Sequence, residues 1–318
     1  MLVDDLTLID CIGKGAFSNV YLTSKNGNSK QYATKVIEKP VSYMEENVKK
    51  YIDREISILK EVDHPNIIKF IESKETEKKI YIVTEYCNGG ELESYLLRHQ
   101  LQNKNGLSEE IVQHIMKQIV NALEYLSAKE IMYRNIVLRD ILINYEDEND
   151  KRNNNILKGT IKIIDFGFAI HLKKGELAYT TLGSPINMSP LLLNKLSFNE
   201  NYKNIGYDEK EDVWSLGAIC YELLTGKPAF DSNNFEELTV KVDKGDYYVP
   251  TTLSKEAISF LKCMLQYESK NRLSFSELKN QDFLTKKVEE FSKVDLNEFK
   301  NITKENEPQI ILNSKSNE

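Results

Sequence analysis

The hydrophobic pattern of the chain changes its period once, at Cys87-Asn88-Gly89-Gly90. Ahead of this point, short runs rich in β-branched and aromatic residues are separated by turn residues, which is the pattern of β-strands. These runs cover residues 6–11, 19–24, 31–37, 69–72 and 79–86. Beyond it, apolar residues recur every three or four positions, which is the period of an α-helix. The sequence therefore predicts a small β-rich unit, a hinge, and a larger, mainly helical unit.

One helix interrupts the predicted strands. Apolar residues recur at helical spacing from Val48 to Leu59, and Glu55 lies at the edge of this stripe. The helix should end at His64-Pro65-Asn66, because the residue before a proline is disfavoured in the helical conformation. In the second unit two apolar stripes predict further helices, and their residues are Ile111, Ile115, Ile119 and Leu123, then Val213, Leu216, Cys220 and Leu223.

Charge and composition limit the classes of partner. The 318 residues carry 42 Lys and Arg against 49 Asp and Glu, which gives a formal net charge of -7. Such a chain has no general electrostatic attraction for nucleic acid or for an anionic membrane, so neither is expected as a partner. No apolar run reaches the length of a membrane span and the N-terminus lacks the features of a secretory signal, so we expect a soluble, cytoplasmic protein. The scattered cysteines and histidines match no zinc site.

Two polar stretches interrupt the helical unit, at residues 145–158 and 195–208. Both are expected to be surface loops, because they contain too few apolar residues to pack. From about Lys286 the chain is charged and amphipathic, and its last residues are expected to be disordered. The apolar residues of this tail are spaced as in a helix that either folds back on the helical unit or docks on a partner; they are Val288, Phe291, Val294, Leu296 and Phe299.

The first candidate for chemistry is a glycine pair, Gly13 and Gly15, at the turn between two predicted strands. Glycines in such a turn let backbone amides close over phosphate groups, but on their own they more often serve only as a turn. Lys35 follows in the next predicted strand, and a lysine in a strand that looks buried needs a charged partner. Glu55, on the helical stripe, is the candidate partner.

The ordered motifs of the chain resemble those of the Ser/Thr branch of the eukaryotic protein kinase superfamily. Besides the glycine loop, Lys35 and Glu55, they are residues 80–92 (IYIVTEYCNGGEL), Asp165-Phe166-Gly167, Gly183-Ser184-Pro185 and residues 212–217 (DVWSLG). The likeness covers residues 5–284. It implies an α+β, bilobal protein-kinase fold, with a β-rich N-lobe containing one helix at 5–86, a hinge at 85–90 and a larger, mainly helical C-lobe at 91–284. Residues 285–318 are then a helical or partly disordered C-terminal tail.

The resemblance implies ATP and Mg²⁺ as cofactors and assigns residues to them. Lys35 would bind the α and β phosphates while Glu55 holds it in place. Asp165 and Asp140 would be the metal ligands. The other residues assigned to the nucleotide are Gly13 and Gly15 in the glycine loop, Val20, Ala33 and Leu142 around the adenine, Thr84 as the gatekeeper, and Glu85 to Cys87 at the hinge.

The catalytic loop departs from the family pattern H-R-D-L-K-P-E-N, because residues 133–140 read YRNIVLRD. Asn135 replaces the aspartate that accepts the proton of the substrate hydroxyl, and a neutral amide has no basicity near pH 7. Val137 replaces the lysine that steadies the γ-phosphate. Asp140 replaces the asparagine that holds the second metal ion, and a carboxylate is at least as good an oxygen ligand. Asp140 is not expected to take over as the base, because in the family this position faces the metal.

The activation segment departs as well. Leu191 stands where the family has a glutamate that pairs with Arg272, so we expect a carbonyl or a nearby glutamate to replace it as partner, or a looser segment. Thr180 and Thr181 lie where the family carries an activating phosphate, and Arg134 would receive it. The alternative is that both are unmodified surface threonines.

Three functions are open at this point. The first is a pseudokinase, in which ATP and Mg²⁺ set the closure of the lobes and a protein partner responds to it. The second is a weakly active Ser/Thr protein kinase that transfers the γ-phosphate of ATP to protein hydroxyls by positioning and metal electrostatics alone. The third is a nucleotide-independent scaffold. The first is favoured, because the nucleotide-binding positions are intact and the transfer positions are altered. The protein partner or substrate and the oligomeric state do not follow from the sequence.

Overall fold

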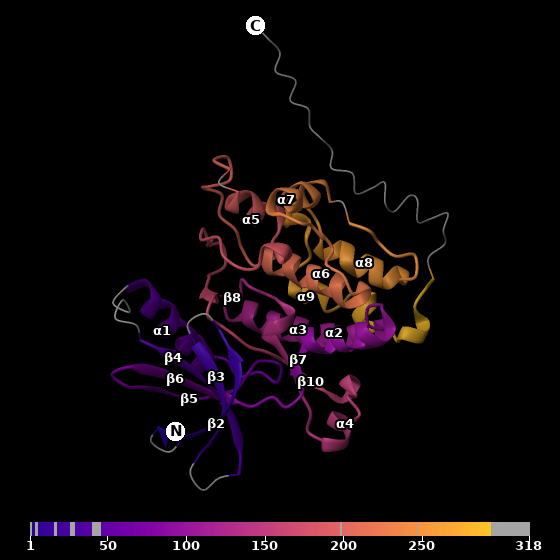
Figure 1. Cartoon of the computed structure of the whole chain (residues 1–318). Helices are drawn as coiled ribbons and strands as arrows, with labels where there is room; N and C mark the ends of the chain where they lie inside the picture. Colours follow the sequence, from indigo (N-terminus) through magenta and orange to yellow (C-terminus); the bar gives the residue numbers. More distant parts are fainter. Residues whose placement is uncertain are drawn as a thin grey trace.

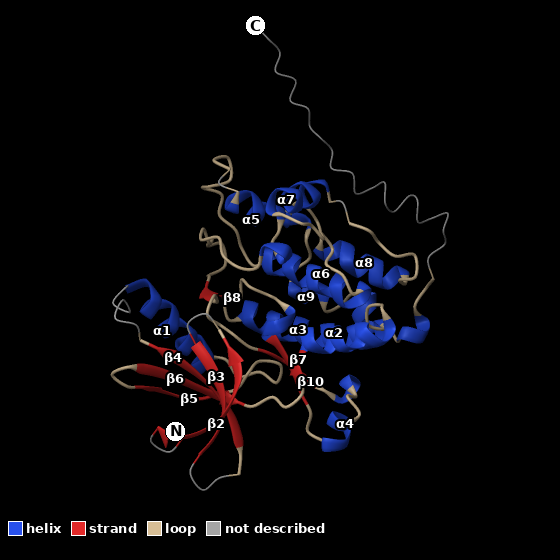
Figure 2. Cartoon of the chain, in the orientation of Figure 1, coloured by secondary structure: helices blue, strands red, loops and turns tan. Residues whose placement is uncertain are grey.

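The computed structural model describes residues 2–3, 6–15, 18–25, 29–39, 46–197, 199–245 and 247–293. A β-rich lobe and a helical lobe lie side by side, and the chain passes from one to the other after Glu85 (Figure 1, Figure 2). The bilobal α+β fold expected from the sequence is confirmed.

The N-lobe is a six-stranded antiparallel sheet with the order β1-β2-β3-β4-β6-β5. Its strands are β1 (Leu2–Val3), β2 (Leu6–Lys14), β3 (Ser18–Lys25), β4 (Gln31–Glu38), β5 (Phe70–Glu75) and β6 (Lys79–Glu85). Successive side chains of a strand point to opposite faces. In β4, Tyr32, Thr34 and Val36 are buried on one face, which leaves Ala33 and Lys35 together on the other.

Helix α1 (Glu46–Glu61) accompanies the sheet in the N-lobe (Figure 1). Its inward stripe buries Ile52, Glu55 and Leu59, at the spacing that the sequence shows. The helix ends before His64-Pro65, as predicted. Glu55 is thereby carried into the interior, where a carboxylate needs a charged partner.

The C-lobe consists mainly of helices. They are α2 (Leu92–Asn103), α3 (Glu109–Ala128), α4 (Glu148–Arg152), α5 (Pro190–Leu196), α6 (Lys210–Thr225), α7 (Phe235–Lys244), α8 (Lys255–Met264), α9 (Phe275–Leu278) and α10 (Asp282–Thr285). Short antiparallel strands cover the side that faces the N-lobe; they are β7 (Gly90–Glu91), β8 (Ile131–Met132), β9 (Ile141–Asn144), β10 (Thr160–Ile163) and β11 (Ile170–His171). Among the residues described, no helix combines the length and the apolar character needed to cross a bilayer.

Helix α6 is the centre of the C-lobe. It is buried on all sides, including Glu211 and Asp212 in its first turn, whereas the sequence predicted a single apolar face. A helix that is apolar all round belongs in the interior of a domain. Gly217 permits close packing against α8, because a Cβ at this position would lie 2.8 Å from Cβ of Met264.

The prediction that residues 145–158 and 195–208 are unpacked surface loops is wrong in part. The first stretch contains α4 and buries Tyr145 and Ile156. In the second, the ammonium group of Lys195 donates hydrogen bonds to three backbone carbonyls, those of Tyr202, Lys203 and Ile205. A count of apolar residues misses such order, because it comes from side-chain to backbone hydrogen bonds.

The first residues of the tail fold back on the C-lobe. After α10 they form a short 3-10 turn, Val288–Glu290, in place of the predicted helix. The ring of Phe291 then packs on that of Phe283 at a centroid distance of 5.6 Å, and Glu256 accepts the backbone N–H of Ser292 at 2.8 Å. The rest of the predicted stripe lies outside the described residues, namely Val294, Leu296 and Phe299.

Candidate functional site

Lys35, Glu55 and Asp165 meet between the two lobes. Nζ of Lys35 lies 2.7 Å from Oε1 of Glu55 and 3.5 Å from Oδ1 of Asp165. Burial lowers the pKa of Lys35, but the two carboxylates outweigh burial and raise this pKa above its ordinary value. Burial and the negative charge of Asp165 raise the pKa of Glu55, although Lys35 acts in the opposite direction. The structure thus joins the two residues that the sequence paired and adds Asp165 to them.

Asp165 is held in an unusual backbone conformation. Its φ is 59°, in the left-handed region, and its Oδ1 accepts the N–H of Gly167 at 3.1 Å. Phe166 is fully buried, and its ring meets that of Tyr133 edge to face at a centroid distance of 5.3 Å. A non-glycine residue keeps such a conformation only where its surroundings enforce it. The buried Phe166 therefore fixes the direction of the Asp165 carboxylate.

Asp212, on α6, supports the loop of residues 133–140. Its two carboxylate oxygens accept the backbone N–H groups of Tyr133 at 2.8 Å and of Arg134 at 2.7 Å. Arg134 also has a left-handed backbone, with φ of 75°. Burial raises the pKa of Asp212 to about 7, although the two hydrogen bonds act in the opposite direction. Sequence reasoning gave Asp212 no role, but a carboxylate at the start of a buried helix is a signal that it binds donors.

Asn135 uses both ends of its amide. Its Oδ1 accepts the backbone N–H of Ser184 at 3.2 Å, and its Nδ2 donates to Oδ2 of Asp140 at 3.3 Å. Asn135 is half-buried, and Val137 beside it is buried. The amide therefore links Ser184 of the activation segment to Asp140. The sequence did not reveal the contact with Ser184.

Asp140 and Asp165 are the carboxylates that could hold a metal ion. Burial and the charge of Asp165 raise the pKa of Asp140 to about 7. A divalent cation would relieve this repulsion, so the donor set fits Mg²⁺. Across the described ranges, no group of three or more His, Cys, Asp or Glu side chains is placed to bind a metal by itself. Two carboxylates suffice for Mg²⁺, which commonly completes its shell with phosphate oxygens and water.

The glycine turn connects β2 to β3. The N–H of Gly15 donates to the carbonyl of Ser18 at 2.7 Å, and Gly13 pairs with Val20 across the two strands. Val20 pairs in turn with Lys35 of β4, so the register places the turn beside the lysine. Ala16 and Phe17 of this turn lie outside the described residues. The apolar residues assigned to the nucleotide are all half-buried, namely Val20, Ala33 and Leu142.

The hinge residues follow β6. Thr84 pairs with Ala33 across the sheet. The carboxylate of Glu85 is occupied by Lys162, with 2.7 Å between Nζ and Oε1, so a ligand at the hinge would meet the backbone of Glu85. Burial raises the pKa of the Cys87 thiol to about 12, which makes it a packing residue and not a nucleophile.

Thr180 is exposed and Thr181 is half-buried. Arg134 is buried, with its Nε donating to the carbonyl of Phe168 at 2.6 Å. Burial raises the pKa of Tyr207, and the nearby guanidinium of Arg134 acts in the opposite direction. The hydroxyl of Tyr207 donates to the carbonyl of Thr180. Tyr207 thus contacts Thr180 and is influenced by the charge of Arg134, and a phosphate on either threonine stays a prediction.

Arg272 has an acidic partner in place of the missing one. Its Nη1 lies 3.0 Å from Oε1 of Glu211, and Leu191 is half-buried against the core. Three other N–H groups of the guanidinium donate to the backbone carbonyls of Lys210, Gln266 and Tyr267. The expectation that a nearby glutamate and carbonyls take over is confirmed.

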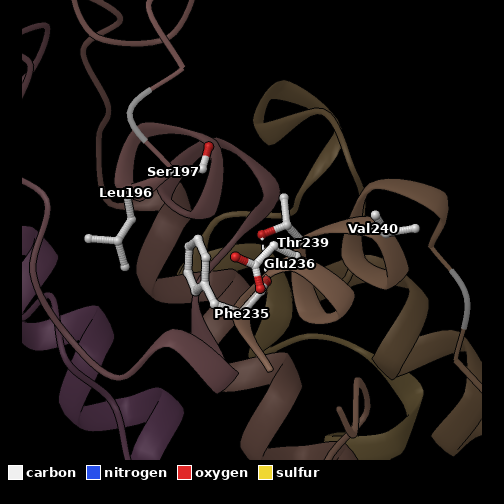
Figure 3. A pocket seen from close by; sticks show the side chains of 6 residues that line it. All are labelled: Leu196, Ser197, Phe235, Glu236, Thr239 and Val240. Carbon is white, nitrogen blue, oxygen red and sulfur yellow. Dashed lines mark hydrogen bonds between the residues drawn. The ribbon is translucent and has the colours of Figure 1, made fainter. Parts of the chain in front are cut away.

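A separate groove of about 480 Å³ lies between α5 and α7 (Figure 3). It is largely apolar and lined by Leu196, Ser197, Phe235, Glu236, Thr239 and Val240. None of the residues assigned to the nucleotide or the metal lines it.

Comparisons with known proteins identify the family of this site. A family model for the protein kinase domain matches residues 6–284. Serine/threonine-protein kinase ATG1a of Arabidopsis thaliana is 33% identical over 288 residues, which are 89% of this chain and 42% of that protein. Calcium-dependent protein kinase 5 of Plasmodium falciparum is 33% identical over 271 residues, 84% of this chain and 43% of that protein. Human serine/threonine-protein kinase ULK1 is 33% identical over 279 residues, which are 86% of this chain and 25% of that protein.

The chain spans less than half the length of each of these relatives. The family match nevertheless includes both lobes and all the site residues described above. The chain belongs to the protein kinase family, and serine/threonine kinases are among its relatives.

Proposed function

We propose that this chain is a Ser/Thr protein-kinase-like domain that binds ATP with Mg²⁺ but is impaired in phosphoryl transfer, which makes it a pseudokinase. It acts in the cytoplasm as a signalling or scaffold module that is controlled by nucleotide binding. Its partner is a protein. Membership of the kinase family supports the nucleotide, and the residues of the loop at 133–140 support the impairment.

The binding half of the proposal rests on the assembled cluster of charges. Bound ATP with Mg²⁺ would supply a transferable γ-phosphate and a divalent charge. Lys35, held by Glu55, would donate to phosphate oxygens, and Asp165 and Asp140 would ligate the metal. The glycine turn at Gly15 would offer backbone N–H groups to the phosphates.

The observation that carries the proposal is the engagement of Asn135. The group at the base position is a neutral amide, and both of its polar atoms already have partners. A positioned base contributes roughly 10²- to 10⁴-fold to such reactions, so this contribution is lost. Val137 is buried and apolar, and it adds no positive charge near the γ-phosphate.

Lobe closure is the output that a bound nucleotide can set. Lys35 belongs to the N-lobe and Asp165 to the C-lobe, so a ligand that contacts both stabilises one arrangement of the lobes. A protein partner that contacts both lobes would then distinguish the bound from the free state.

A thermal-shift measurement tests the binding half. ATP with Mg²⁺ at about 100 times the dissociation constant should raise the Tm by about 5 to 10 °C. Lys35→Ala should abolish the shift, because it removes the cation that faces the phosphates. Lys174→Ala, on an exposed lysine outside the site, serves as the matched control and should keep the shift. An unchanged Tm in the parent protein would leave the nucleotide-independent scaffold as the function.

A weakly active kinase is the second candidate, because the Lys35, Glu55 and Asp165 cluster is fully assembled. Phosphoryl transfer depends largely on positioning and electrostatics, which this cluster supplies. Asn135→Asp with Val137→Lys should raise phosphate transfer at least about 10²-fold, because it restores both a base and a cation. A double variant that binds ATP but transfers no phosphate would place the defect in the activation segment.

A further inference from the structure

The catalytic loop differs from the kinase pattern by an exchange of two groups. The family has a carboxylate at the position of Asn135 and an amide at the position of Asp140, and this chain has the reverse. The two substitutions together leave the formal charge of the loop unchanged.

The two exchanged residues touch each other. Nδ2 of Asn135 donates to Oδ2 of Asp140 at 3.3 Å, while Oδ1 of Asn135 accepts the N–H of Ser184 at 3.2 Å. An amide is the side chain of this size that presents a donor at one end and an acceptor at the other. Asn135 therefore satisfies two neighbours that need opposite partners.

A carboxylate at position 135 would satisfy only one of them. It could still accept the N–H of Ser184, but it would place a second anion at hydrogen-bond distance from Asp140. Both positions are half-buried, so water screens such a repulsion poorly. Val137 supplies no cation, and burial and the charge of Asp165 raise the pKa of Asp140, although Arg139 and Lys35 act in the opposite direction.

We propose that residues 135 and 140 form one exchanged amide–carboxylate pair, in which Asn135 is a positioning residue that holds Asp140 and Ser184. While position 137 is a valine, a carboxylate is accommodated at one of the two positions only when the other carries an amide. This deepens the proposed function, because it means that Asn135→Asp alone does not recreate the family's site. The reciprocal exchange, Asn135→Asp with Asp140→Asn, does recreate its arrangement of donors and acceptors.

A four-variant cycle tests the pair without nucleotide. Asn135→Asp should lower the Tm by about 4 to 8 °C, because it sets two carboxylates against each other. Asp140→Asn should change the Tm by no more than about 2 °C, since the new amide oxygen still accepts from Asn135. The reciprocal double variant should return to within about 2 °C of the parent protein. If Asn135→Asp fails to fold while the double variant folds, that rescue is itself the expected coupling.

Mg²⁺ separates this electrostatic coupling from simple damage to packing. Mg²⁺ alone should raise the Tm of Asn135→Asp more than that of the parent protein or of the double variant, because a divalent cation relieves repulsion between carboxylates. Asn149→Asp makes the same chemical change on an exposed residue of α4 and should leave the Tm and its Mg²⁺ response unchanged.

The proposal would be overturned if Asn135→Asp lowered the Tm equally in the parent background and in the Asp140→Asn background. Identical Mg²⁺ responses in all four variants would overturn it as well. The cycle needs no nucleotide, so its result is independent of ATP binding. Absence of an ATP-induced shift in the parent protein would refute the proposed function and leave the pair intact.

Discussion

Asn135 and Leu191 stand where the kinase family has a carboxylate. Asp140 contacts Asn135 at the base position, and Glu211 pairs with Arg272 at 3.0 Å although Leu191 has replaced the family's glutamate. Glu211 preserves the stability of the buried Arg272, because a buried guanidinium needs only a nearby anion. Asp140 beside Asn135 does not restore catalysis in the same way, because a base must reach the substrate hydroxyl within hydrogen-bond distance.

The pair of Glu211 and Arg272 should therefore matter for stability. Both side chains are almost completely buried, so Glu211→Gln leaves a buried cation with carbonyl partners only. We expect the free energy of unfolding to fall by about 2 to 4 kcal/mol, measured by urea denaturation. Glu200→Gln is the control, since Glu200 pairs with Lys203 on the surface at 3.6 Å and should cost less than about 1 kcal/mol. Equal losses in the two variants would contradict this assignment.

At the scale of single residues, the sequence located the charged side chains of the site but not the groups that orient them. Lys35 and Glu55 follow from strand alternation and helical spacing, and the structure joins them at 2.7 Å. Asp212 and Ser184 act through backbone N–H groups, with Asp212 as acceptor and Ser184 as donor. Such contacts depend on the tertiary arrangement, which leaves no periodic mark in the sequence.

At the scale of elements, the charge of a carboxylate on α2 acts on a carboxylate near the end of α6. Burial and the charge of Glu93 on α2 raise the pKa of Glu222 on α6 to about 7. The folded protein thus keeps this proton up to about pH 7, whereas the unfolded chain loses it near pH 4.5. The free energy of unfolding should therefore fall as the pH rises through this interval, because the folded state binds more protons there.

Glu222→Gln removes this dependence. At pH 8 the variant should be more stable than the parent protein by about 1 to 2 kcal/mol, a value reduced to allow for partial solvent screening. At about pH 4 the two should be alike, since Glu222 is then protonated in both the folded and the unfolded parent chain. Urea denaturation at the two pH values measures the difference. An equal difference at both pH values would show that the proton of Glu222 is not responsible.

Elements with a strong period were predictable and elements held by local contacts were not. The predicted strands and the helix from Val48 to Leu59 correspond to β2 to β6 and to α1. Helix α4 spans only Glu148–Arg152, and Asp147 caps it by accepting the N–H groups of Asn149 and Asp150. A five-residue helix is too short to show a period, so its capping residue was the one signal available.

At the scale of the whole molecule, the two lobes are tied together close to the site. The N–H of Ile68 donates to the carbonyl of Ile163 at 2.9 Å, and the N–H of Ile163 donates to the carbonyl of Asn66 at 2.8 Å. Ile163 ends β10, two residues ahead of Asp165. The backbone that carries Asp165 is thereby anchored to the segment that follows α1 in the N-lobe. A nucleotide bound as proposed to Lys35 and Asp165 would add a second tie between the lobes, and its occupancy would in this way alter their relative position.

The transfer of labelled γ-phosphate tests most directly whether this kinase-like domain has lost its chemistry. The protein is incubated with labelled ATP and Mg²⁺, alone and with a generic basic acceptor protein, and Asp165→Ala is carried in parallel. Because Asn135 offers no base and Val137 no cation, we expect no label above that of Asp165→Ala, on the domain or on the acceptor. Label that requires Mg²⁺ and disappears in Asp165→Ala would show an active kinase that works without the usual base, and would contradict the assignment as a pseudokinase.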